Sequence, residues 1–368
     1  MAQDTPPADN ADPHVEALTG VLLPLLSALD GLQFAQRHLY PPMLGQLVAR
    51  VQDLEAPLRD GLAAFQALDW PEHMAPFREC LDTAVEMSVR GIQGMRNALD
   101  EPEGIVTAYR ALRHIPRAME ALYPLTRGLP PVSRFFLEDG VVSDETFMAR
   151  LEAAEGTPGE VGVMHAENDR KSRGGFSLYV PEYYDASAPC PLVMALHGGT
   201  GHGRAFLWTW LKEARSRGLI LLAPTARDTT WSLMPPDIDT ENIEAMLAWV
   251  REKWAVDETR MLLTDMSDGG TFTYVSGLRG ASPFSHLAPI SASFHPMMLD
   301  FLDGPKIEGR KIYLTHGVLD WMFNIDVARV AHTVLTQAGA EVEYREIADL
   351  SHTYPREENT RILDWFLG

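Results

Sequence analysis

Apolar residues follow two different patterns along the chain and divide it into two parts. From about residue 14 to 155 they recur every three or four positions, the spacing of one face of a helix. Two such stripes are Met74, Phe77, Leu81, Val85, Ile92, Met95, Leu99 and Ile105, Tyr109, Leu112, Met119, Tyr123. Prolines divide this region into about five or six helices, which predicts a helical bundle.

After residue 160 the pattern changes to short, β-branched apolar runs that alternate with helical segments. Strands are predicted at 176–180, 192–196, 219–223, 260–264, 286–291, 311–315 and 342–347. Helices are predicted near 203–217, 240–254, 270–279, 324–338 and 356–367. This alternation predicts an α/β fold, a mostly parallel sheet flanked by helices. We expect a disordered tail (1–13), a helical domain (14–155), a turn-rich linker (156–160) and an α/β domain (161–368).

The charge balance and the apolar runs exclude some classes of partner. The sequence has 51 acidic and 31 basic residues, a formal charge of −20, which disfavours nucleic acid and anionic membrane surfaces. No apolar run reaches the ~20 residues of a membrane span, and Pro24 interrupts the leucine-rich stretch 18–29, so we expect no membrane span. Two cysteines are too few for a disulfide framework or a thiolate metal site.

The first residues bear on the compartment. Residues 1–7 lack the basic and apolar regions of a secretory signal, which predicts a cytoplasmic protein. If a signal sequence had been removed and a Met placed before the mature N-terminus, the first residues would look the same. A periplasmic or secreted origin therefore stays open.

Polar residues that follow the predicted strands carry the candidate chemistry, because ligands gather at the carboxyl ends of parallel strands. Ser267, Asp320 and His352 each follow such a strand. A serine hydroxyl is a poor nucleophile until a base takes its proton, and that base needs a third group to hold its tautomer. The chain order Ser, Asp, His suits a sheet of this kind. We therefore predict Ser267 as nucleophile, His352 as base and Asp320 as the acid that orients it.

Other residues fit these roles less well. The rival serines, Ser291 and Ser293, follow a strand without a flanking glycine turn. Among rival acids, Asp326 falls inside a helical pattern and Asp349 is expected to face solvent. The rival bases lie in Gly or Pro turns before or away from the last strand: His197, His202, His295 and His316.

These segments together resemble the α/β-hydrolase superfamily over about residues 160–368. Segments 179–181 and 192–199 are similar to the entry strands of polyhydroxybutyrate-depolymerase-like, feruloyl-esterase-like and phospholipase/carboxylesterase-like enzymes. Segment 256–270 resembles their approach to the nucleophile, and 316–320 resembles their acid loop. The resemblance implies an α/β-hydrolase catalytic domain with a Ser-Asp-His triad and without a metal or organic cofactor.

The family pattern also implies where a tetrahedral oxyanion would bind. One donor is the backbone N–H of Asp268, the residue after the nucleophile. A second comes from the loop after His197, with Gly199 and Thr200 as candidates. Glycines in this loop would also allow the backbone to approach a substrate closely.

One residue departs from the usual G-x-S-x-G turn around the nucleophile, because Asp265 stands where the first glycine belongs. Gly269 keeps the second glycine position. Asp265 could form hydrogen bonds with nearby backbone groups, or it could place a negative charge near the site and raise the pKa of the histidine. The sequence leaves both alternatives open.

Four aromatic residues near these loops are candidates for a substrate pocket, with core packing as the alternative for each. They are Trp321, Phe294, Trp231 and Phe206. Trp321 is the strongest candidate because it directly follows the predicted acid.

The sequence thus predicts a cofactor-free serine esterase that forms an acyl-enzyme from a small or medium ester substrate. Peptide or lactone cleavage by the same triad is one alternative, and a non-catalytic binding protein with a degraded turn is another. For the helical domain two roles stay open: a cap over the active-site cleft, or an interface that would join copies of the chain into a homo-oligomer.

Overall fold

The computed structural model describes residues 12–154, 159–302 and 304–368. The chain divides into two compact units, one formed by residues up to Gln36 together with Pro41–Val132, the other by Arg37–Tyr40 and Ser133–Gly368. Residues 133–154, which we expected in the helical domain, therefore group with the C-terminal unit. Most of the predicted tail and part of the predicted linker, residues 1–11 and 155–158, lie outside the described residues.

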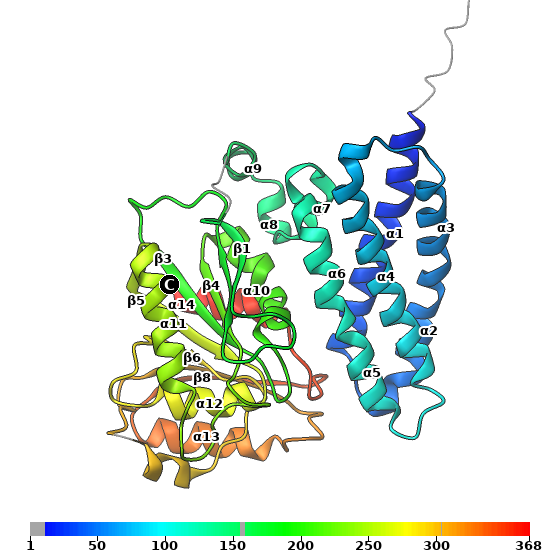
Figure 1. Cartoon of the computed structure of the whole chain (residues 1–368). Coiled ribbons are helices and arrows are strands. Elements are labelled where there is room, and N and C mark those ends of the chain that lie inside the picture. Colours follow the sequence, from blue (N-terminus) through cyan, green and yellow to red (C-terminus); the bar gives the residue numbers. More distant parts are fainter. Residues whose placement is uncertain (1–11, 155–158, 303) are drawn as a thin grey trace, which may run out of the picture. The chain divides into compact units, whose positions relative to one another are not determined.

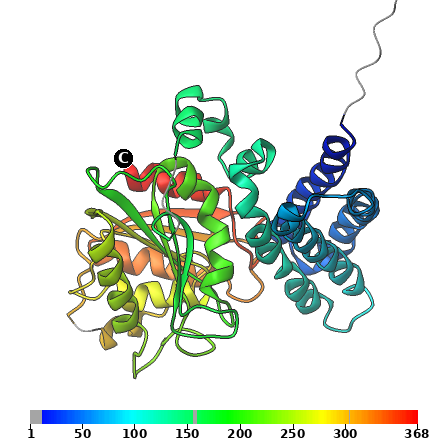
Figure 2. The ribbon, with the colours of Figure 1, turned by 45° about the horizontal axis from the view of Figure 1, so that its top comes forward.

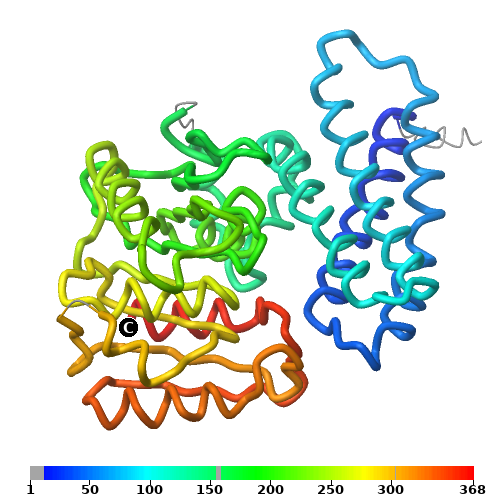
Figure 3. Tube along the Cα trace, turned by 60° about the horizontal axis from the view of Figure 1, so that its bottom comes forward, coloured from blue at the N-terminus to red at the C-terminus, as the bar shows by residue number. Residues whose placement is uncertain are grey.

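The N-terminal unit is a helical bundle, as predicted, and Figures 1 and 3 show its long helices side by side. Its α-helices are α1 (Pro13–Arg37), α2 (Leu44–Val51), α3 (Glu55–Gln66), α4 (Ala75–Asn97), α5 (Gly104–Leu112) and α6 (His114–Leu122). Helix α4 contacts α3, α5 and α6. Helices α1 and α3 approach closely, because a Cβ on Gly61 would lie 2.3 Å from the carbonyl oxygen of Gly20.

Helix α1 is long and apolar enough, by length and composition alone, to cross a membrane, a test that the core helix of a soluble protein also passes. Its residues Val21, Leu25, Leu29 and Leu32 are fully buried, and their spacing places them on one helix face. Pro24 lies inside this helix and does not end it. One third of its most apolar stretch is buried, and a single helix of this kind is weak evidence for a membrane span.

The described part of the C-terminal unit contains eight strands that form one sheet in the order β1-β2-β4-β3-β5-β6-β7-β8. The strands are β1 (Gly162–Ala166), β2 (Phe176–Val180), β3 (Cys190–Leu196), β4 (Ile220–Pro224), β5 (Val256–Asp265), β6 (His286–Ala288), β7 (Lys311–Gly317) and β8 (Glu341–Ile347). Strand β2 runs antiparallel to β1 and β4, and all other pairs are parallel. The predicted strands are confirmed, but sequence reasoning missed β1, a half-exposed edge strand without clear alternation.

Helices cover both faces of this sheet, as Figures 1 and 2 show. Met194 and Leu196 pack into a core cluster with residues of α11 (Thr240–Lys253), α12 (Asp268–Gly277) and α13 (Asp326–Gln337). The alternate residues Val193 and Ala195 are also fully buried, and successive side chains of a strand point to opposite faces. Helices α10 (Gly203–Arg217) and α14 (Glu358–Leu367) contact each other. Burial on both faces explains why the strands read as continuous apolar runs.

Three short helices precede the sheet in the sequence: α7 (Pro130–Phe135), α8 (Asp139–Val142) and α9 (Glu145–Glu152). Strands β3, β5, β7 and β8 are parallel neighbours or near neighbours, so their carboxyl ends meet at one edge of the sheet. The residues that follow these strands are the predicted site residues.

Candidate active site

Ser267 lies in a strained turn between the end of β5 and the start of α12. Its backbone has φ 59° and ψ −116°, a conformation that a residue with a side chain rarely adopts and that neighbouring structure must hold. Two hydrogen bonds hold this turn: Ser267 N–H donates to the Ile290 carbonyl at 3.0 Å, and Met266 N–H donates to the Leu196 carbonyl at 3.1 Å. The turn is therefore hydrogen-bonded to the end of β3 and to the segment after β6, the two strands on either side of β5.

The glycine after Ser267 is required by close packing. A Cβ on Gly269 would lie 2.7 Å from the carbonyl oxygens of both Leu196 and His197. No larger residue fits between the start of α12 and the end of β3. The second glycine of the G-x-S-x-G pattern thus has a steric reason here.

Ser267, His352 and Asp320 form one hydrogen-bonded chain. The distance from Ser267 Oγ to His352 Nε2 is 2.9 Å, and that from His352 Nδ1 to Asp320 Oδ2 is 2.8 Å. Because a carboxylate only accepts hydrogen bonds, Nδ1 carries the proton, and Nε2 is left to accept from the serine hydroxyl. All three residues are buried, with exposed fractions of 8%, 6% and 7% for Ser267, His352 and Asp320.

Asp320 is itself held in place by the backbone. Its Oδ1 accepts the N–H groups of Met322 at 2.9 Å and Phe323 at 2.8 Å, which leaves Oδ2 directed to His352. A Cβ on Gly317 would lie 2.2 Å from the Leu350 carbonyl oxygen. This glycine lets the loop that carries the acid approach the loop that carries the histidine.

The loop that carries His352 is held by Arg37, a residue that sequence reasoning missed. Arg37 is nine-tenths buried, and its guanidinium forms ion pairs with Asp349 at 3.0 Å and Glu357 at 2.5 Å, one on each side of the histidine. The hydroxyl of Thr353 donates to the Arg37 carbonyl at 2.8 Å. No local motif links residues more than 300 positions apart, so the sequence held no signal for this contact.

Two backbone N–H groups near Ser267 have no acceptor among the described residues: those of Asp268 and Gly199. The two residues are close neighbours, because a Cβ on Gly199 would lie 2.6 Å from Asp268 Oδ2. The N–H of Thr200, the other predicted candidate, donates to the Thr229 carbonyl at 2.9 Å. Of the two candidates in this loop, the structure leaves only Gly199 with a free donor.

Asp265 forms a hydrogen bond with the backbone, which was one of the two expected alternatives. Its Oδ1 accepts the N–H of Ile290 at 2.8 Å, and the carbonyl of the same residue accepts from Ser267. Complete burial raises the pKa of the Asp265 carboxyl well above its ordinary value, and the Ile290 hydrogen bond offsets only part of this rise. Burial thus disfavours the charged form of this carboxyl, and with it the second alternative, a negative charge near the site.

The four predicted pocket aromatics divide into two groups. Trp321 is 45% exposed, and Phe206 is half-buried with its ring 5.5 Å from that of Tyr354. Trp231 and Phe294 are buried and contact other aromatic rings, Trp231 that of Phe272 and Phe294 that of Tyr274. These two residues pack in the core, where the alternative interpretation placed them.

Four of the rival site residues have other partners. His197 donates from Nδ1 to the Gly198 carbonyl and accepts the Ala226 N–H at Nε2, and burial lowers its pKa to about 3. His202 and His295 cap helices. Asp326 forms an ion pair with Arg329. None of these residues competes for Ser267.

Within the described ranges, no group of three or more His, Cys, Asp or Glu side chains is arranged to hold a metal ion. Catalysis without a metal or an organic cofactor stays a prediction.

The comparisons with known proteins found relatives among esterases. No protein-family model matches the chain. A protein named probable feruloyl esterase C from Aspergillus oryzae is 26% identical over 141 residues, 36% of this chain and 50% of that protein. Acetylxylan esterase A from Emericella nidulans is 26% identical over 136 residues, 34% of this chain and 44% of that protein. The chain thus spans about half the length of the curated relatives it matches.

Among solved structures, the Staphylococcus aureus fluorophosphonate-binding serine hydrolase FphF is similar, with 14% identity and a TM-score of 0.44. The match covers 56% of this chain and 97% of that one. The assignment of the fold rests on the strand order, on the strained serine turn after β5 and on the acid and histidine after β7 and β8. The C-terminal unit therefore has the α/β-hydrolase fold, and part of the chain is similar in sequence to fungal esterases.

Proposed function

We propose that this protein hydrolyses carboxylic esters through an acyl-enzyme on Ser267. The observation that carries the proposal is the hydrogen-bonded chain from Ser267 Oγ through His352 to Asp320, with distances of 2.9 and 2.8 Å. These distances lie within the reach that proton transfer between nucleophile and base requires. The similarity to proteins named as esterases supports the choice of an ester as the substrate.

In this mechanism Ser267 Oγ attacks the ester carbonyl carbon while His352 Nε2 takes its proton. Asp320 stabilises the imidazolium and keeps its orientation. The tetrahedral adduct expels the alcohol, which receives the proton from His352. A water molecule then attacks the acyl-enzyme with His352 as base, and the acid leaves with Ser267 restored.

The N–H groups of Asp268 and Gly199 fit the role of oxyanion donors, because both lie beside Ser267 and lack acceptors among the described residues. Each such donor is worth about 3 kcal/mol of the barrier. The hydrogen bonds to the Ile290 and Leu196 carbonyls hold the strained turn, and with it the nucleophile, beside them.

Replacement of the nucleophile tests the proposal. Ser267→Ala should lower hydrolysis of p-nitrophenyl acetate by about 10⁴-fold or more and abolish labelling by a fluorophosphonate probe. Ser293→Ala, a rival serine outside the hydrogen-bonded chain, should keep both. Hydrolysis that persists in folded Ser267→Ala protein would refute the assignment.

The same three side chains can also cleave amides and lactones. A panel of aminoacyl amides, lactones and esters separates these reactions. A higher kcat/KM for amides or lactones than for every ester would overturn the choice of bond, and an unlabelled, correctly folded wild-type protein would favour a binding protein.

A further inference from the structure

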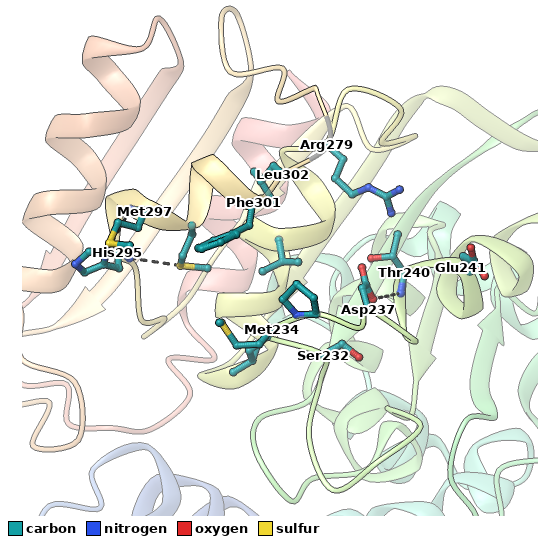
Figure 4. Close-up of a pocket in the computed structure, with 14 residues that line it drawn as sticks. Ser232, Met234, Asp237, Thr240, Glu241, Arg279, His295, Met297, Phe301 and Leu302 are labelled. Carbon is teal, nitrogen blue, oxygen red and sulfur yellow. Dashed lines mark hydrogen bonds between the residues drawn. The ribbon is translucent and has the colours of Figure 1, made fainter.

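A cavity of about 420 Å³ lies beside α12 in the C-terminal unit. It is formed by the segment before α11, by α12 and by the 3₁₀ helix Pro296–Phe301 with the residues next to it. Figure 4 shows its lining side chains. The volume falls in the range of pockets that bind small molecules.

The walls of the cavity are mainly apolar and unusually exposed for large side chains. Met234, Met297 and Phe301 are 67%, 56% and 61% exposed, and Met298 and Val275 add to the lining. Exposed apolar groups that cluster around a concave surface mark a binding site. Methionines suit a pocket that adapts its shape to a flexible ligand.

Polar groups gather toward one end of the cavity in the view of Figure 4: Arg279, Thr240, Asp237 and Glu241. Thr240 is 1% exposed, and its buried hydroxyl has no hydrogen-bond partner among the described residues. The Arg279 side chain, which is partly exposed, also lines this end of the cavity. Buried polar groups are normally paired, so the Thr240 hydroxyl indicates a ligand with a polar end.

The charges at this end favour an uncharged ligand group. Two carboxylates, those of Asp237 and Glu241, and one guanidinium, that of Arg279, line this end. These two carboxylates would repel an anionic ligand group and the guanidinium would repel a cationic one, whereas a hydroxyl can accept from Arg279 and donate to a carboxylate or to Thr240.

The cavity follows the helix that begins at the nucleophile. Val275, in α12, is eight residues after Ser267, which places it about 12 Å along the helix axis. Arg279 lies two residues beyond the end of this helix. The loops that border the cavity also contact the start of α12: Thr230 donates to Asp268 at 2.6 Å, and Ser293 N–H donates to Thr271 at 3.1 Å. Arg279, at the polar end, therefore lies past the end of α12 that is distant from Ser267.

We propose that this cavity is a substrate subsite that takes the far part of a long ester, an apolar chain or ring that ends in an uncharged hydroxyl group. The inference rests on the proposed function and adds the substrate class. The group that occupies the subsite belongs either to the acyl part or to the alcohol part of the ester.

Val275→Phe tests the subsite, because the larger ring narrows the cavity. The matched control is Val330→Phe, on the exposed surface of α13, where the wild-type valine is 42% exposed. The substrates are p-nitrophenyl acetate, octanoate and dodecanoate, and, for the alcohol part, ethyl and dodecyl acetate. Val275→Phe should lower kcat/KM for the long members of one series by about tenfold or more while the short esters change less than about twofold. Val330→Phe should change neither.

Two further variants keep the test decisive. Phe301→Ala alters a wall residue that is 61% exposed, and it should also weaken hydrolysis of long esters alone. Thr240→Val keeps the side-chain shape but removes the hydroxyl, and it should reduce any preference for the ω-hydroxydodecanoate ester over the dodecanoate ester by about three- to tenfold.

If Val275→Phe affected short and long esters equally, or affected neither, the proposal of a subsite would be overturned. That result differs from a failure of the proposed function, in which wild-type protein hydrolyses no ester of any length and Ser267 is not labelled by a fluorophosphonate.

Discussion

Asp265 replaces the glycine that usually begins the serine turn, and the structure gives it a positioning role. Its carboxyl accepts the N–H of Ile290, and the carbonyl of Ile290 accepts the N–H of Ser267. Gly270 provides the space, because a Cβ there would lie 2.5 Å from Asp265 Oδ1. Asp265 and Gly270, the residue directly after the usual motif, therefore form one unit that supports the strained turn.

Asp265→Asn should keep the turn, because the amide oxygen can accept the same Ile290 N–H. Asp265→Ala leaves that buried N–H unpaired and should lower the free energy of unfolding by about 1–3 kcal/mol. Urea unfolding measures the stability, and the rate of fluorophosphonate labelling measures the geometry of Ser267. Labelling as fast in the Ala variant as in wild type would refute the positioning role.

The same substitution predicts a dependence on pH. Because the pKa of Asp265 is raised in the folded protein above its ordinary value of 3.8, the folded state binds the proton more tightly than the unfolded state. Wild-type stability therefore falls as pH rises from about 4 toward the raised pKa. Asn cannot titrate, so the stability of Asp265→Asn relative to wild type should increase with pH over this range. A constant difference between pH 4 and pH 8 would contradict a buried neutral acid.

At the scale of elements, the loop after β8 depends on a four-residue segment from the end of α1, Arg37–Tyr40, which belongs to the C-terminal unit. Arg37 binds Asp349 and Glu357 on either side of His352. The hydrogen bond from Arg37 holds the pKa of Asp349 below its ordinary value, so this pair persists at neutral pH and is lost as pH falls through the lowered pKa.

Arg37→Met should slow catalysis by about tenfold or more, because loss of these contacts lets His352 shift relative to Ser267. The loss should appear in kcat and in the rate of fluorophosphonate labelling, with a smaller change in KM. Arg260→Met is a matched control, because Arg260 forms an ion pair with Asp257 near the start of β5. If both variants behave alike, Arg37 has no positioning role.

At the scale of the whole molecule, two units with separate cores predict two unfolding steps. Leu58, fully buried in α3, belongs to the helical unit, and Leu263, fully buried in β5, belongs to the C-terminal unit. Leu58→Ala should destabilise the helical unit by about 2–5 kcal/mol.

Calorimetry of the full chain measures this effect. Leu58→Ala should lower the midpoint temperature of one transition and leave labelling of Ser267 at 25 °C intact. Leu263→Ala should lower the midpoint temperature of the other transition. A single transition shifted equally by both variants would show that the units unfold together.

The sequence by itself determined the elements of the C-terminal unit and the order of its site residues. Burial on both faces produces continuous apolar strands, and chain order places Ser267, Asp320 and His352 after β5, β7 and β8. These are local signals, because each depends on a few neighbouring residues. The half-exposed edge strand β1 was missed for the same reason, since its five residues carry no such pattern.

Only the tertiary structure decided which distant groups meet. Arg37 contacts the loop of His352, and Asp265 accepts the N–H of Ile290. The Thr200 N–H donates to the Thr229 carbonyl, and Trp231 and Phe294 are buried in the core. It also grouped residues 133–154 with the C-terminal unit. These contacts join residues far apart in the chain, so they depend on packing of the whole unit, which local periodicity and spacing do not encode.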